Sequence, residues 1–155
     1  MNARILIVDD HEVLREGLKA LLAKARPEWK ICGEAIEGKQ AIHLARELKP
    51  DLIILDISMP GMSGLEACSE MRNMGIAIPV LIFTTHSSGL LGAEVRDAGA
   101  QGYVVKSQAA HRLMVAIETL LTGGTFFDSA EKPASVKKDK PIPGIVRCQG
   151  LALAT

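Results

Sequence analysis

Asp9, Asp10, Asp56, Thr84 and Lys106 each follow a short apolar run, or another polar residue that does. A carboxylate at the end of a buried strand is costly unless its charge is needed there. If these runs are neighbouring strands of one parallel sheet, their polar ends meet at one edge. Three carboxylates in one place repel each other and require a cation. The pattern therefore predicts a metal-assisted site that handles an anionic group such as phosphate.

The all-oxygen donor set favours Mg²⁺, with Mn²⁺ as an alternative. We expect Asp10 and Asp56 to bind the metal directly, the backbone carbonyl of Ser58 to add a ligand, and Asp9 to act through water. Asp56 is the innermost carboxylate and is the predicted phosphoryl acceptor, forming an acyl phosphate. Thr84 and Lys106 would each bind one phosphoryl oxygen. The four histidines have no metal-ligand spacing, so carboxylates are favoured over His11 and His86.

Each residue also has a purely structural explanation when it is taken alone. Asp9 and Asp10 could cap a helix, and Asp56 could form a turn. Lys106 could be a surface cation, and Thr84 a hydroxyl at the end of a strand. Separate structural explanations are less convincing for the whole set, because all of these residues fall at strand ends on the same predicted edge of the sheet.

Hydrophobic periodicity predicts an α/β fold in which strand and helix alternate five times. We expect a doubly wound, parallel five-stranded sheet in the order 2-1-3-4-5, which places the first and third strands side by side. The expected strands are 4–8, 29–35, 52–55, 79–83 and 102–105, and the expected helices are 12–25, 37–48, 64–73, 89–99 and 108–122.

The overall composition excludes several classes of protein. Eighteen basic and 18 acidic residues give a formal net charge of zero, which offers no general attraction to nucleic acid or anionic membranes. No apolar run is long enough to cross a bilayer. Three scattered cysteines in no metal spacing predict reduced thiols in a cytoplasmic protein.

Three segments carry a family resemblance: 8–11 (Val-Asp-Asp-His), 55–64 (Leu-Asp-Ile-Ser-Met-Pro-Gly-Met-Ser-Gly) and 99–106 (Gly-Ala-Gln-Gly-Tyr-Val-Val-Lys). As a set, they resemble the CheY-like receiver domain of two-component response regulators, over residues 4 to about 122. Segments 9–11 (Asp-Asp-His) and 123–127 (Gly-Gly-Thr-Phe-Phe) resemble most the NarL/FixJ type of transcriptional regulator.

The resemblance implies a flavodoxin-like fold and phosphorylation of Asp56 by a histidine kinase with Mg²⁺. It implies a phosphoacceptor switch rather than an enzyme, with only self-phosphorylation and autodephosphorylation. In that switch Thr84 moves toward the phosphoryl group and Tyr103 turns inward, although Tyr103 alone could simply be an edge aromatic. The switched surface is the fourth helix, fifth strand and fifth helix, residues 89–121, and a phosphorylation-linked homodimer through it is expected.

We expect a receiver domain at 1–125 and a flexible linker at 126–155, without an output domain and without DNA-binding residues. One alternative is the truncated receiver half of a NarL/FixJ-type DNA-binding regulator. Another is a phosphohydrolase of the haloacid-dehalogenase type, but Ser58 stands where such enzymes carry their acid. Ser107 replaces the proline that many receivers have after the lysine, which NarL-like proteins often lack as well.

Overall fold

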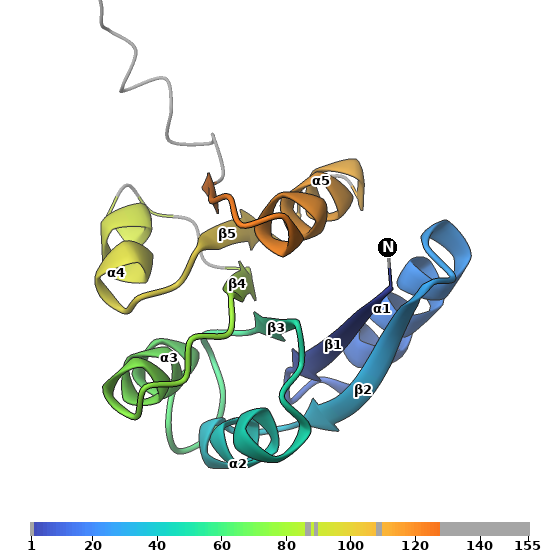
Figure 1. Cartoon of the computed structure of the whole chain (residues 1–155). Coiled ribbons are helices and arrows are strands. Elements are labelled where there is room, and N and C mark those ends of the chain that lie inside the picture. Colours follow the sequence, from blue (N-terminus) through green and yellow to red (C-terminus); the bar gives the residue numbers. More distant parts are fainter. Residues whose placement is uncertain (1, 86–87, 89, 108–109, 128–155) are drawn as a thin grey trace, which may run out of the picture.

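Strands and helices alternate along the chain in a computed structural model that describes residues 2–85, 88, 90–107 and 110–127 (Figure 1). The strands are β1 (Ala3–Val8), β2 (Trp29–Ala35), β3 (Leu52–Leu55), β4 (Val80–Thr84), β5 (Gly102–Val105) and β6 (Phe126–Phe127). The helices are α1 (Glu12–Ala25), α2 (Gly38–Leu48), α3 (Gly64–Asn73), α4 (Leu91–Asp97) and α5 (Ala110–Leu121).

All strands pair in parallel, in the order β2-β1-β3-β4-β5-β6. The expected α/β fold and the order of the first five strands are therefore confirmed. The predicted count of five strands is one too low, because Phe126 and Phe127 add a sixth strand beside β5. The linker expected from residue 126 thus begins with two residues that belong to the sheet, and residues 128–155 lie outside the described part of the chain.

The two faces of the sheet carry separate aliphatic cores. On one face, α2, α3 and α4 pack over alternate strand residues such as Leu6, Ile53 and Ile82. On the other face, α1 and α5 pack over residues such as Ile7 and Ile54. Burial on both faces explains why β3 is a continuous apolar run rather than an alternating one.

The loop between β3 and α3 ends in a close backbone contact. Ser63 caps α3: its hydroxyl accepts from the amide of Glu66, whose carboxylate accepts from the amide of Ser63. The next residue, Gly64, donates its amide to the Ile57 carbonyl at 2.9 Å. A Cβ on Gly64 would lie 2.0 Å from the carbonyl oxygen of Asp56, so only glycine fits here. The start of α3 is therefore packed directly against the Asp56 backbone.

A half-buried arginine joins α3 to the segment that precedes β5. The guanidinium of Arg72 donates to the carbonyls of Gly99, Ile76 and Ile78 and to the side-chain oxygen of Gln101, at 2.6–2.9 Å. The same Gln101 oxygen accepts from the amide of Val80, at the start of β4. One side chain thus satisfies the carbonyls of two loops at once.

The predicted element bounds differ from the observed ones mainly around the fourth helix. Among the described residues of the run 89–99, the helix covers Leu91–Asp97 and ends before Gly99, which has a positive φ. Thr84, expected just after its strand, is the last residue of β4. Among the described residues, no helix combines the length and apolarity that crossing a membrane demands.

Candidate functional site

The strand register brings two of the predicted carboxylates together. Val8 of β1 and Leu55 of β3 are direct partners in the sheet, so Asp9 and Asp56 are the next residues on adjacent strands. Their amides extend the ladder: Asp9 donates to the Ala35 carbonyl and Asp56 to the Val8 carbonyl, both at 3.0 Å. Both backbones are therefore fixed by the sheet up to the residue that carries the carboxylate.

Lys106, which follows β5, reaches the Asp9 and Asp56 carboxylates across the end of β4. Its amide donates to the Thr84 carbonyl at 2.7 Å, which fixes the end of β5 against the end of β4. Its Nζ lies 2.8 Å from Oδ2 of Asp9 and 3.5 Å from Oδ1 of Asp56. The ammonium group therefore bridges two carboxylates that would otherwise repel each other.

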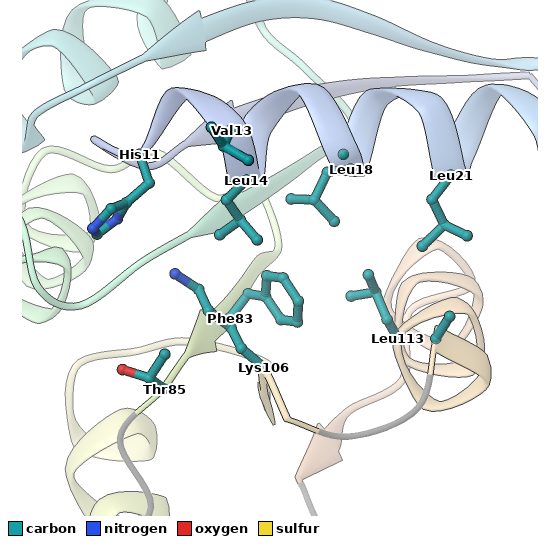
Figure 2. A pocket seen from close by; sticks show the side chains of 11 residues that line it. His11, Val13, Leu14, Leu18, Leu21, Phe83, Thr85, Lys106 and Leu113 are labelled. Carbon is teal, nitrogen blue, oxygen red and sulfur yellow. The ribbon is translucent and has the colours of Figure 1, made fainter.

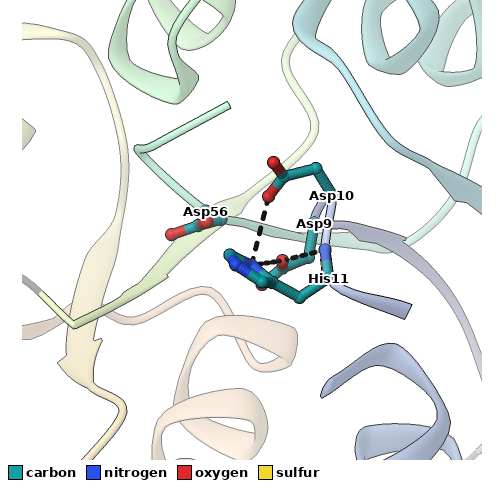
Figure 3. A group of neighbouring side chains, drawn as sticks. All are labelled: Asp9, Asp10, His11 and Asp56. Atoms are coloured by element: carbon teal, nitrogen blue, oxygen red, sulfur yellow. Dashed lines mark hydrogen bonds and ion pairs between the residues drawn. The ribbon is translucent and has the colours of Figure 1, made fainter. Parts of the chain in front are cut away.

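Asp10 and His11 complete the cluster at the start of α1 (Figure 3). Ligand atoms of Asp9, Asp10, His11 and Asp56 all lie within 4.8 Å of one another. The Nδ1 atom of His11 is 3.0 Å from Oδ1 of Asp9 and 3.2 Å from Oδ1 of Asp10. The sequence favoured carboxylates over His11, yet the imidazole lies among them. The sequence carries no metal-ligand spacing that could have indicated this position of His11.

The outer side of this loop is fixed by Arg15. Its Nη1 donates to the Asp9 carbonyl at 2.7 Å, and its Nε donates to Oε1 of Glu34 at 2.9 Å. Lys19 binds the other Glu34 oxygen, and the two cations lower the pKa of the Glu34 carboxyl. The Asp9 side chain also accepts from the His11 amide at 2.8 Å, directly before α1, so its carboxylate is fixed by the backbone of the same loop.

The site is buried and carries an excess of negative charge. Asp9 and Asp56 are 2% and 3% exposed. Burial raises the pKa of Asp56; Lys106 opposes this shift, and the charge of Asp9 adds to it. With His11 neutral, three carboxylates and one ammonium leave a formal charge of −2. A divalent cation bound by these oxygens would neutralise the cluster, so the donor set and its charge both fit Mg²⁺ or Mn²⁺.

A mostly apolar cavity of about 580 Å³ opens beside the cluster, between α1 and α5 (Figure 2). Its lining includes His11, Leu14, Phe83, Lys106 and Leu113. Lys106 therefore contacts the carboxylates with its amino group while its stem lines an apolar space.

The other residues considered from the sequence are Thr84, Tyr103, Ser58 and His86. Thr84 is fully buried at the end of β4, next to the site, and Tyr103 is fully buried in β5. Ser58 lies exposed in the loop after Asp56, and the role of its backbone carbonyl as a metal ligand remains a prediction. His86 falls outside the described residues. The structure thus brings together Asp9, Asp10, Asp56 and Lys106, while the roles assigned to them remain predictions.

Comparison with known sequences gives one consistent group. Residues 5–118 match the family described as "Response regulator receiver domain". The transcriptional regulatory protein YdfI of Bacillus subtilis is 42% identical over 120 residues, which cover 77% of this chain and 55% of that protein. The nitrate/nitrite response regulator protein NarL of Escherichia coli is 38% identical over 133 residues, which cover 84% and 60%. The chain thus spans somewhat more than half the length of these relatives.

Solved structures agree with the sequence matches. A two-component response regulator of the LuxR family from Aurantimonas superposes with a TM-score of 0.81 at 36% identity, covering 86% of this chain and 94% of that one. The signal receiver domain of a putative response regulator NarL from Mycobacterium tuberculosis gives 0.74 at 27% identity, covering 79% and 98%. These matches favour a signalling domain over the phosphohydrolase alternative.

Proposed function

This chain belongs to the response regulator receiver family, a family of signalling switches, and we propose that it receives its signal as a phosphoryl group on Asp56. The observation that carries the proposal is the convergence at one sheet edge of Asp9, Asp10 and Asp56 with the amino group of Lys106. Asp56 is the most suitable acceptor, because β3 is buried on both sides and holds its backbone rigid.

The carboxylates provide the expected metal site. Asp10 and Asp56 would bind Mg²⁺ directly, with the Ser58 carbonyl as a further ligand and Asp9 acting through water. When bound, the metal would neutralise the −2 charge and allow an anionic phosphoryl donor to approach. Asp10 is suited to direct binding because its side chain is about one-third exposed, whereas that of Asp9 is buried and already paired with Lys106.

The phosphoryl transfer itself needs only a nucleophile and charge stabilisation. A carboxylate oxygen of Asp56 forms a bond to phosphorus while the bond from phosphorus to the leaving group breaks, which yields an acyl phosphate. The leaving group is the imidazole of a histidine kinase or the carboxylate of a small acyl phosphate. Lys106 is close enough to Asp56 to bind one transferred oxygen, and Thr84 would bind another.

The signal would leave through the surface formed by α4, β5 and α5. Thr84 is the last residue of β4, which pairs with β5, and Tyr103 lies in β5 itself. The two switch residues, Thr84 and Tyr103, therefore adjoin this surface. Lys106 follows directly after β5. We propose a cognate histidine kinase as the phosphoryl source, a phosphorylation-linked homodimer and a cytoplasmic location.

The direct test is incubation of the purified chain with acetyl phosphate and Mg²⁺, followed by intact-protein mass spectrometry. We expect a gain of one phosphoryl group, which disappears with a chelator and in Asp56→Asn. Circular dichroism before and after verifies that each sample is folded. An unchanged mass in folded, Mg²⁺-loaded protein would refute the proposal. Sedimentation with and without beryllofluoride tests the dimer separately, and equal values would count against it.

A further inference from the structure

The short strand β6 covers the one tyrosine of the chain. It pairs with β5 in parallel, with Gly102 opposite Phe126 and Tyr103 opposite Phe127, and the Phe126 amide donates to the Gln101 carbonyl at 3.0 Å. A Cβ on Gly102 would lie 2.2 Å from the Phe126 carbonyl oxygen. The close approach of β6 to β5 therefore depends on glycine at position 102.

The two phenylalanines of β6 point to opposite faces of the sheet. The Phe127 ring lies 6.4 Å from the Tyr103 ring at an angle of 42°, and the guanidinium of Arg96 from α4 lies over it at 4.0 Å. The Phe126 ring packs with the α1 and α5 core, 5.4 Å from the Arg112 guanidinium. Phe127 alone thus connects β6 to Tyr103 and α4, while Phe126 is a matched residue on the other face.

This cover matters because β5 would otherwise be the edge of the described sheet. Tyr103 is 0% exposed although it lies on this outer strand. We propose that β6 is an intramolecular cover that keeps Tyr103 inside the protein and that Phe127 is coupled through β5 to the phosphoryl-acceptor site.

The connection to the site runs through two strands. Tyr103 is the partner of Ile82 in β4, and Thr84 lies two residues further along on the same face. Lys106 comes directly after the four residues of β5 and contacts Asp9 and Asp56. Loosening the outer side of β5 therefore weakens the placement of Lys106. This step rests on the proposed phosphorylation of Asp56.

The first experiment uses the presence of a single tyrosine. Protein labelled with 3-fluorotyrosine gives one ¹⁹F resonance, which reports on Tyr103 alone. We expect the wild-type resonance to be insensitive to a soluble paramagnetic chelate, and Phe127→Ala to make it sensitive. Phe126→Ala should leave it protected, although it removes the same ring. Emission from the only tryptophan, the buried Trp29, verifies folding of both variants. Equal protection of Tyr103 in both variants would overturn the cover.

The second experiment measures the coupling in both directions, since linkage between two sites is reciprocal. Beryllofluoride with Mg²⁺ should change the hydrogen exchange of the Phe127 segment. Phe127→Ala and Gly102→Ala should each weaken beryllofluoride binding by about five-fold or more, and Phe126→Ala should not. Absence of beryllofluoride binding to wild-type protein refutes the proposed function. Wild-type binding that is unchanged in both Phe127→Ala and Gly102→Ala refutes only the coupling.

Discussion

Replacing Gly64 with alanine should damage the candidate site without touching any of its side chains. The added methyl group would lie 2.0 Å from the Asp56 carbonyl oxygen and 2.8 Å from its carbon. Contacts below 3.0 Å are essentially never seen, so the two backbones must separate by at least about 1 Å. Such overpacking costs roughly 1–3 kcal/mol. A displacement of about 1 Å at a reacting group lowers rates by up to about 100-fold.

Two measurements on the Gly64→Ala variant test this prediction. Urea unfolding monitored by Trp29 fluorescence gives the free energy of unfolding, and acetyl phosphate labelling in excess Mg²⁺ gives the rate of phosphorylation. The matched control is Gly17→Ala, in the middle of α1, where an added Cβ meets nothing within 4 Å. It should stabilise the protein by about 0.5–1 kcal/mol, because alanine favours a helix over glycine. Its labelling rate should stay at the wild-type value.

A positioning role for Gly64 requires that Gly64→Ala both destabilises the protein and slows its phosphorylation. Gly64→Ala protein that is as stable as wild type would show that the contact is not tight. A destabilised variant that is labelled at the normal rate would show that α3 moves away and leaves Asp56 in place. Either result would refute the positioning role of Gly64.

Three further predictions concern the charges of the site. In chelator, Asp56→Asn should stabilise the fold, by on the order of 1 kcal/mol. Because burial raises the Asp56 pKa, the stability of the wild-type protein falls as pH rises through that pKa. The stabilisation of Asp56→Asn relative to wild type should therefore grow with pH and then level off. A stabilisation that does not depend on pH would contradict this prediction. Lys106→Met should cost about 3 kcal/mol in urea unfolding, since Asp9 loses its buried partner, and an unchanged midpoint would disprove the pairing. Mg²⁺ at 100 times its dissociation constant should stabilise the wild-type fold by about 2.7 kcal/mol. The same Mg²⁺ concentration should stabilise Asp10→Asn much less. Equal thermal shifts in the wild type and Asp10→Asn would exclude Asp10 as a ligand.

The sequence was sufficient to predict the carboxylate cluster for a physical reason. Parallel strands buried on both faces are continuous apolar runs, so Asp9 and Asp56 mark the strand ends without ambiguity. Helical crossovers then restrict the sheet to a few orders, and the doubly wound one places β1 beside β3. The convergence of distant residues was therefore accessible from local pattern alone.

Other features depend on tertiary contacts that no local pattern records. A two-residue strand such as Phe126–Phe127 has no measurable periodicity, and its pairing requires the bare backbone of Gly102. His11 stands outside any metal spacing, and only the folded loop turns its ring between two carboxylates. The fourth helix was predicted too long at its C-terminal end, because Gly99 adopts a left-handed conformation that ends the helix.

The Arg72 cluster determines how α4 could move. Four oxygen atoms around one half-buried guanidinium connect the chain just after the C-terminal end of α4 to the end of α3 and the start of β4. The other end of α4, near Leu90, has no side-chain cap. We therefore expect any displacement of this helix to pivot near Gly99 and to be largest at its N-terminal end, near Leu91. The same contacts hold the start of β5 in place, so we expect any displacement at Tyr103 to be confined to the segment between Gln101 and Lys106.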